Sequence, residues 1–300
     1  MFRDIIRQMK SKNIVLICID CLRSDLFFEN DGNTTFIDHI IANETTYQNL
    51  HTSANTTTPA VASLMTGTYS EKNGVHSLRE SKLNKSTDTL AEILSKYGYD
   101  TYANVTGPLS ANTGLNRGFD SYHHRSESTD IDEDVLDEFA DWMKSTEDPF
   151  FAYFHLWELH APVEVSEQYD DPSYGRCAYE RKLSELDQKL KRLIEHVKRE
   201  DCVILITGDH GEAFSWRGTA VQFTLSRIRG SLRFDNGFDT RNAERAVNRF
   251  LSKFSIDIHD HPIENGHRET VGDFVTNVPL AIIDDNLPGN TFDQQCRQID

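Results

Sequence analysis

The chain has 300 residues, of which 38% are hydrophobic and 26% charged, a composition that suits one large α/β domain and excludes wholesale disorder. The formal net charge of −17, without a basic stripe to offset it, excludes nucleic acid as an expected partner. An anionic substrate would have to be drawn in by a local positive source such as a metal ion.

Apolar runs and helical patterns alternate along the chain. Runs rich in Ile, Val and Phe predict buried strands, at Asn13–Asp20, Tyr99–Val105, Pro149–Trp157, Cys202–Thr207 and Val278–Ile283. Helical spacing of apolar residues predicts helices, at Thr34–Ala42, Thr58–Met65, Leu90–Tyr97, Ile131–Lys144 and Tyr179–Arg199. The alternation predicts an α/β fold with a mostly parallel central sheet and helices on both faces.

The five cysteines are odd in number and scattered in spacing, so we expect reduced thiols. Cys18 and Cys21 have the spacing of a redox or zinc motif, but no matching pair follows, which favours a structural role. No apolar run reaches the roughly 18 residues that a membrane span needs, and the N-terminal segment lacks the apolar core of a signal peptide. These features predict a cytoplasmic protein without a membrane span.

Polar side chains stand at the ends of three predicted strands. Asp20 ends the first strand, His160 lies just after the third, and Asp209 and His210 follow the fourth. Ligands bind at the carboxyl ends of strands in open parallel sheets. A carboxylate beside an imidazole forms a plausible pair of metal ligands, and Asp20 supplies a third. The alternative is that Asp209 caps a helix and His210 is a surface histidine.

Three consecutive threonines precede the helical run that follows residue 58. We expect Thr58 to be the N-cap and Pro59 the first helical residue, which leaves Thr57 just before a helix N-terminus. Free N–H groups and the helix dipole favour an anion at such a place. A hydroxyl held there against a metal ion can become a nucleophile. The alternative is that Thr56, Thr57 and Thr58 only cap the helix.

Several segments follow one another as in the sulfatase-like branch of the alkaline phosphatase superfamily, and together they resemble that family from about residue 12 to 285. They are NIVLICIDCLRSD, TTPAVASLMTGTYSEKNGV, TLAEILSKYGYDTYANVTG, GLNRGFDSY, HLWELHAPV, ITGDHGEAF and GHRETVGDFVTNVPLAII. The resemblance implies an alkaline phosphatase-like α/β fold. It also implies a metal-dependent hydrolase or transferase of sulfate or phosphate esters, phosphodiesters included, acting on an anionic small-molecule, glycan or lipid head-group ester.

Position by position, the resemblance also implies the metal site. Asp20, Asp209 and His210 would bind a divalent metal ion, with calcium, manganese, magnesium and zinc as the candidates. Thr57 would be both the nucleophile and a further metal ligand.

Two more histidines take roles from the resemblance. His160 and His267 would contact the anionic ester group or its leaving group. If a second metal is present, as in the phosphatase relatives, Glu158 would join these two histidines as a ligand. The alternatives are that His160 is a hydrogen-bonded histidine beside a strand end and that His267 is a loop residue.

The chain departs from the sulfatase pattern at the nucleophile and at the expected anion contacts. Thr57 stands where sulfatases have the Cys or Ser that becomes formylglycine, and Val61 stands where they have an Arg. Cys21 replaces a second acidic residue, and the segment 104–107 replaces a Lys-x-His. The threonine instead resembles the phosphodiesterases, phosphonate hydrolases and phosphoethanolamine or glycerophosphate transferases of the superfamily. The missing cations keep open a second hypothesis, a catalytically silent relative that binds a sulfated or phosphorylated ligand.

The stretch Ala213–Glu264 interrupts the alternation of strands and helices and contains one predicted helix, at Arg241–Lys253. We predict a single sulfatase-like catalytic domain over residues 1–300, with 213–264 as an insertion or lid that sets specificity. The chain stops where the family pattern suggests a further helix, so the domain is expected to be shortened at its C-terminus.

Overall fold

The computed structural model describes residues 12–125, 129–146, 149–197, 202–214, 224, 227–240, 266–267 and 271–299. In these residues one sheet runs in the order β4-β3-β5-β1-β6-β7-β2-β8, and β9 also pairs with β2. The strands are β1 Asn13–Ile19, β2 Thr45–His51, β3 Asp100–Val105, β4 Ser121–His124, β5 Phe150–Leu156, β6 Cys202–Gly208, β7 Asn277–Ile283, β8 Asn290–Phe292 and β9 Cys296–Arg297. Every pairing is parallel except the two made by β7, which confirms the mostly parallel sheet.

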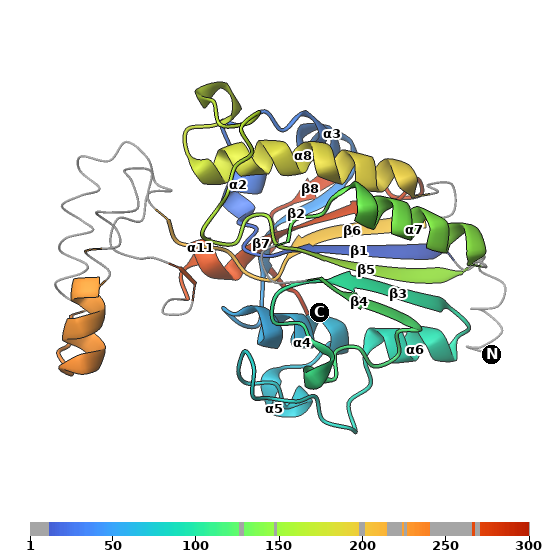
Figure 1. Ribbon diagram of the computed structural model, residues 1–300, viewed down its shortest axis with the longest axis horizontal. Helices are drawn as coiled ribbons and strands as arrows, with labels where there is room; N and C mark the ends of the chain where they lie inside the picture. The colour runs from blue at the N-terminus through green and yellow to red at the C-terminus, as the bar shows by residue number, and fades with distance from the viewer. Residues whose placement is uncertain are drawn as a thin grey trace.

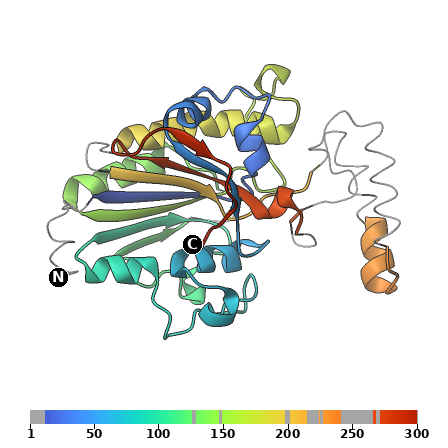
Figure 2. The same ribbon diagram turned by 180° about the vertical axis from the view of Figure 1, so that it is seen from behind.

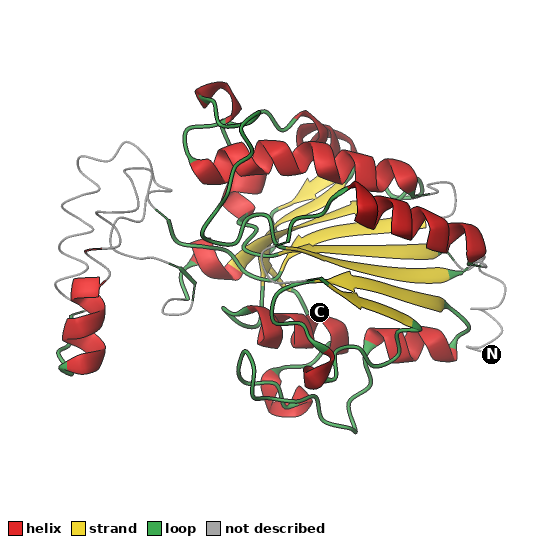
Figure 3. Ribbon diagram, viewed as in Figure 1, coloured by secondary structure: helices red, strands yellow, loops and turns green. Residues whose placement is uncertain are grey.

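Helices cover both faces of this sheet (Figures 1 and 3). One face carries α2 Ser24–Phe28, α3 Thr35–Asn43, α7 Glu133–Ser145 and α8 Ala178–His196, and the other carries α4 Thr57–Thr66, α5 Ser70–Asn73 and α6 Leu90–Lys96. The view from behind in Figure 2 shows the same two layers. Other short helices among the described residues include η1 Ala111–Thr113, η2 Pro172–Tyr174, η3 Ser231–Asp235 and α11 Asp273–Thr276.

The central strand β1 contributes to two hydrophobic cores, one on each face of the sheet. Val15, Ile17 and Ile19 pack with α7 and α8, whereas Leu16 and Cys18 pack with α4 and α6. Because a strand covered on both faces buries successive side chains in opposite directions, its sequence is a continuous apolar run. The apolar side of α8 is buried as its spacing predicts, through Leu183, Leu186, Leu190, Leu193 and Ile194.

The helix at the three threonines begins earlier than its sequence predicts. Thr56 is the N-cap, with extended dihedral angles, and Thr57 is the first helical residue. The expectation that Thr58 caps the helix and that Pro59 begins it was therefore wrong. The reason is that the first N–H groups of a helix have no intrahelical acceptor, so a proline fits anywhere in the first turn. Thr57 consequently lies inside the first turn of α4.

Four strands of the sheet were not predicted: β2, β4, β8 and β9. They are short or carry polar residues, because they lie toward the edges of the sheet and are not buried on both faces. All five cysteines are free, and Cys18 and Cys202 are buried as expected. Among the described residues, no helix has the length and apolar character that crossing a membrane requires. The predicted helix Arg241–Lys253 and most of the 213–264 insertion lie outside the described residues.

Candidate active site

The register of the central strands brings two predicted metal ligands together. Ile19 of β1 pairs with Gly208 of β6, so the next residues, Asp20 and Asp209, leave the sheet side by side at its carboxyl edge. The backbone N–H of Asp20 donates to the Leu156 carbonyl at the end of β5, over 2.8 Å. Figure 1 shows β1, β5 and β6 ending at the same edge.

The hydroxyl of Thr57 lies against these side chains. Its Oγ1 is 3.3 Å from Asp20 Oδ2 and 3.3 Å from His210 Nε2, and only 2% of the residue is exposed. The structure therefore assembles all four residues predicted as metal ligands, Asp20, Thr57, Asp209 and His210, although they span 190 positions of the sequence.

The ring of His210 has one edge occupied and one edge directed at this centre. Its Nδ1 is 3.0 Å from the Gly211 carbonyl, which accepts a hydrogen bond and so assigns the ring proton to Nδ1. Nε2 lies 3.4 Å from Asp209 Oδ2. Burial lowers the pKa of His210 to about 4, so the imidazole is neutral near pH 7 and its Nε2 lone pair is available to a metal ion.

The two carboxylates are buried close together, and a bound cation would offset their negative charge. Both are fully buried. Burial, followed by the nearby charge of Asp209, raises the pKa of Asp20 well above its usual value. Burial acts in the same direction on Asp209, but His210 and His155 lower its pKa. Within the described residues, the ion pairs of Asp20 and Asp209 are with histidines and none is with lysine or arginine.

The donor set fits a divalent cation. Asp209 Oδ2 is buried without a hydrogen-bond partner, and an unpaired buried carboxylate oxygen is costly unless it is paired or coordinates a metal. Two carboxylates, a hydroxyl and one neutral imidazole are ligands that suit calcium, magnesium, manganese or zinc.

His155 belongs to the same centre and was missed by sequence analysis. It is fully buried on β5, and its Nε2 is 3.7 Å from Asp209 Oδ2. Neither of its ring nitrogens has a hydrogen-bond partner. The available signal was a histidine inside an otherwise apolar strand, because a buried polar side chain needs a partner.

Cys21 and Glu212 were also missed as members of the site. Cys21 has a φ of 62°, and its N–H donates to Asp209 Oδ1 over 3.2 Å. Its Sγ lies 3.0 Å from Asp20 Oδ1 and 3.3 Å from Glu212 Oε2. The same Glu212 oxygen is 3.1 Å from His267 Nδ1.

The two histidines predicted to contact substrate lie at the site. The ring of His267 is buried and its centroid is 4.1 Å from that of His210. The ring of His160 is 5.6 Å from His267 and stacks on Trp157 at 3.9 Å. Burial lowers the pKa of His160. His267 lies in a bend, as the alternative of a loop residue expected, but its side chain is buried.

Glu158 does not join these histidines, so its expected place as a metal ligand is wrong among the described residues. Its Oε1 accepts a hydrogen bond from the Ile131 N–H over 2.7 Å and lies 3.8 Å from Lys189 Nζ. No group of described metal-ligand atoms includes it. The turn after β5 directs Glu158 toward α7 and α8, whereas it leaves His160 near His267.

Arg23 holds the backbone next to the site in place. Its buried guanidinium donates to Asp25 at 2.9 and 2.5 Å and to the Glu212 carbonyl at 3.2 Å. The chain passes so close here that a Cβ on Gly211 would lie 2.2 Å from the Phe274 carbonyl oxygen, so only glycine fits.

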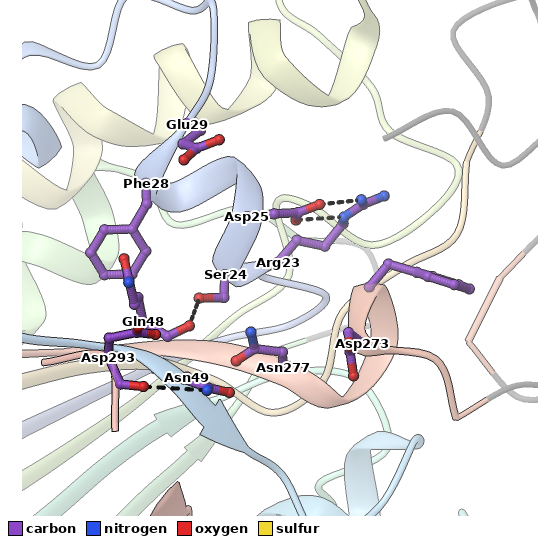
Figure 4. Close-up of a pocket in the computed structure, with 11 residues that line it drawn as sticks. Arg23, Ser24, Asp25, Phe28, Glu29, Gln48, Asn49, Asp273, Asn277 and Asp293 are labelled. Carbon is purple, nitrogen blue, oxygen red and sulfur yellow. Dashed lines mark hydrogen bonds and ion pairs between the residues drawn. The ribbon is translucent and has the colours of Figure 1, made fainter. Parts of the chain in front are cut away.

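Figure 4 shows Arg23 and Asp25 at one wall of a cavity of about 570 Å³. None of the four predicted metal ligands is among the described residues that line it.

Known proteins are similar to this chain in sequence and in fold. The mouse (Mus musculus) arylsulfatase G is 25% identical over 269 residues, covering 66% of this chain and 51% of its own, so the chain spans about half the length of that relative. The phosphonate monoester hydrolase of Agrobacterium radiobacter superposes with a TM-score of 0.69 at 17% identity, over 96% of this chain and 72% of that one. A protein in the alkaline phosphatase superfamily from Vibrio parahaemolyticus gives a TM-score of 0.60 at 17% identity, over 97% and 64%.

These structural likenesses show the alkaline phosphatase-like fold that the sequence predicted. The sulfatase family model matches residues 12–229, which is more than half of the chain and includes β1, α4 and β6. The protein belongs to the sulfatase family.

Proposed function

We propose that this chain is a metal-dependent hydrolase or transferase of phosphate or sulfate esters that uses Thr57 as its nucleophile. The observation that carries the proposal is the position of the Thr57 hydroxyl, buried in the first turn of α4 and 3.3 Å from both Asp20 and His210. A metal ion held by Asp20, Asp209 and His210 would lower the pKa of this hydroxyl and polarise the ester oxygen.

The chain's own residues then have distinct tasks. Thr57 Oγ1 forms a bond to phosphorus or sulfur while the bond to the leaving alcohol breaks, which gives a covalent intermediate on the threonine. The hydroxyl proton leaves along the hydrogen bond to Asp20 Oδ2. His160 and His267 lie beside this centre and are placed to stabilise the charge on the leaving oxygen or to protonate it. Water or an acceptor alcohol then releases Thr57.

The substrate class follows from the nucleophile and its surroundings. Threonine cannot be converted to formylglycine, and Val61 and Asn104 offer no cation to a sulfate group. We therefore place phosphodiesters and phosphonate monoesters ahead of sulfate esters. The names of two similar proteins, an arylsulfatase and a phosphonate monoester hydrolase, support this range of esters. The ester would belong to a small molecule, a glycan or a lipid head group.

An activity panel tests the proposal. Phosphomonoesters, phosphodiesters, phosphonates and sulfate esters are assayed with calcium, magnesium, manganese or zinc. Thr57→Ala should abolish turnover while cation binding persists, and Thr57→Ser should keep part of the activity. Thr66→Ala, at the other end of α4, is the matched control and should behave as the wild type. Mass spectrometry of quenched turnover should find the transferred group on Thr57.

Two results would overturn this function. Full activity of Thr57→Ala would reject the covalent route. Binding of an anionic ester without turnover, with each of the four cations, would instead establish the second hypothesis, a silent relative that recognises a sulfated or phosphorylated ligand.

A further inference from the structure

We propose that a cavity beside His160 binds a protonated amino group carried by the alcohol that leaves the substrate. This assignment rests on the function proposed above, because it concerns the leaving group of the same reaction. The cavity has a volume of about 510 Å³, and it is lined by the segment before α7, the segment after β5 and the first half of α8. Its lining includes Asp132, Glu158, His160, Glu164 and Lys182.

His160 connects this cavity with the reacting groups. It lines the cavity, and its ring is 5.6 Å from the ring of His267, which is 4.1 Å from that of His210. None of the four predicted metal ligands is among the described residues of the lining. Because His160 is placed beside the leaving oxygen in the proposed reaction, the rest of the leaving alcohol can extend into the cavity.

Glu158 brings a buried oxygen without a partner to the cavity. The residue is only 2% exposed, and its Oε1 accepts from the Ile131 N–H and lies 3.8 Å from Lys189 Nζ. Its Oε2 has no hydrogen-bond partner among the described residues. An unpaired buried carboxylate oxygen costs free energy, and burial raises the pKa of Glu158. A ligand that donates an N–H would supply the missing partner and favour the charged form.

Carboxylates outnumber cations around the cavity. Lys182 Nζ contacts Asp130 at 2.6 Å and Glu185 at 3.1 Å, and Lys189 Nζ contacts the same two carboxylates. These two pairs of charges balance each other. The lining contains three further carboxylates, those of Glu158, Asp132 and Glu164.

The remaining basic groups near the cavity do not cancel this excess of negative charge. Burial lowers the pKa of His160, so its ring is neutral near pH 7. Arg125 interacts with Glu158, but its guanidinium donates to the carbonyls of Thr129 and His155. Among the described residues, Asp132 and Glu164 form no ion pair with a lysine or an arginine. The cavity therefore favours a cationic group and disfavours an anion.

The arrangement of the carboxylates favours an organic ammonium group over a metal ion. No group of described ligand atoms with the spacing of a metal site includes a carboxylate of this cavity. The wall already holds one ammonium group, because the Lys182 side chain is only 4% exposed and lies between Asp130 and Glu185. An ammonium group has three donors and can reach carboxylates that are too far apart to share one metal ion.

Three phenols of similar size test this inference without turnover. 4-(Aminomethyl)phenol, 4-(hydroxymethyl)phenol and 4-ethylphenol differ only in ending with an ammonium, a hydroxyl or a methyl group. Binding of each to the purified full chain near pH 7 is measured by titration calorimetry. The amine should bind at least about tenfold more tightly than the other two, the factor expected from one hydrogen bond between charged groups. Any contact of the shared phenol group cancels in this ratio.

Substitutions in the lining locate the preference. Glu158→Gln removes the buried charge and keeps an oxygen for the Ile131 N–H, so the preference for the amine should fall below about threefold. If this variant does not fold, the double variant Asp132→Asn with Glu164→Gln tests the outer carboxylates, and asparagine still caps α7. It should also weaken the preference. Glu167→Gln changes a nearby carboxylate outside the cavity lining and should match the wild type.

Equal binding of the amine and the hydroxymethyl compound, or no binding of any of the three phenols, would overturn the amine site. So would a preference that persists unchanged in the folded lining variants. These results are distinguishable from failure of the proposed function. A preference for the amine without turnover on the ester panel would reject only the reaction, and turnover without the preference would reject only the amine site.

Discussion

Two regions of this molecule bury acidic side chains in opposite ways. Near the start of α7 and along α8, the acidic side chains of Asp130, Glu158 and Glu185 meet Lys182 and Lys189, and we call these five residues the paired cluster. Lys182 Nζ is 2.6 Å from Asp130, and Lys189 Nζ is 2.8 Å from the same carboxylate. Burial opposes ionisation of Asp130, but the two lysines lower its pKa.

The other region is the Thr57 centre, by which we mean Asp20, Thr57, Asp209 and His210. Its two carboxylates have no lysine or arginine partner among the described residues. His210 cannot replace one, since its pKa falls to about 4. Removing one partner from a charge network that is complete within the chain destabilises the fold, because an uncompensated buried charge is left behind. A network that lacks its cation instead costs stability and creates a binding site. The comparison therefore separates structural charge from functional charge by whether each carboxylate has a partner in the chain.

The largest expected effect comes from neutralising one carboxylate in each region, Asp20 in the Thr57 centre and Asp130 in the paired cluster. Asp20→Asn should lower activity and cation affinity by at least about 100-fold, the size that follows from losing even an outer partner of a metal ligand. The metal-free variant should nevertheless melt at a higher temperature near pH 7, because the raised pKa of Asp20 means that folding disfavours its charge. Asp130→Asn should do the reverse and destabilise the fold with cation binding intact. Calorimetry measures the melting temperature of each variant, and metal titration measures its cation affinity. If both variants changed the melting temperature in the same direction, the comparison would fail.

Cation binding at the Thr57 centre should stabilise the protein. A ligand at 100 times its dissociation constant adds about 2.7 kcal/mol to the free energy of unfolding. The melting temperature should therefore rise by several degrees with a suitable divalent metal. The same rise is expected for Lys182→Met, whereas Asp20→Asn should show almost none. An equal rise in Asp20→Asn would place the cation elsewhere.

Removing one lysine from the paired cluster should destabilise the fold only moderately, because the second lysine remains. Lys182→Met should destabilise the fold by about 1–3 kcal/mol, below the full cost of an unpaired buried charge, because Lys189 still contacts Asp130 and Glu185. Denaturant unfolding measures this effect. Lys144→Met removes the exposed pair with Asp141 and is the control, whose stability should not change measurably. A similar loss in both variants would contradict the burial argument.

The last expected effect is a pH dependence in the metal-free protein, which vanishes near pH 7. Unfolded His210 takes up a proton near pH 6.5, whereas the folded residue does so only near pH 4. The unfolded state thus binds the extra proton between these values, and this contribution to stability falls as the pH drops from 6.5 to 4. The raised pKa of Asp20 acts in the opposite direction, so the comparison is with His210→Gln. The melting temperature of the wild type minus that of His210→Gln should fall as the pH drops toward 4. A difference that stays constant would contradict this prediction.

Much of the fold and of the Thr57 centre could be predicted from local sequence. The apolar run of β1 and the 3.6-residue spacing of α8 are local signals that record which side chains are buried. Asp20 and Asp209 each follow a buried strand, so their convergence needed only the rule that parallel strands share a carboxyl edge. Thr57, His160 and His210 were candidates because they stand at a helix start or at strand ends, and the resemblance then supplied their roles and added His267.

Tertiary structure alone decided the rest. The start of α4 at Thr57, the reversed direction of β7 and the separation of Glu158 from His160 all depend on which turns pack against which neighbours. Cys21 and Glu212 gave no periodic signal, because their importance lies in contacts with residues far away in the chain, such as His267. The sequence by itself determined which segments are buried and which carry polar ends, since burial is written in local periodicity. The pairing of charges was decided only when the folded chain set each carboxylate beside a lysine or beside another acid.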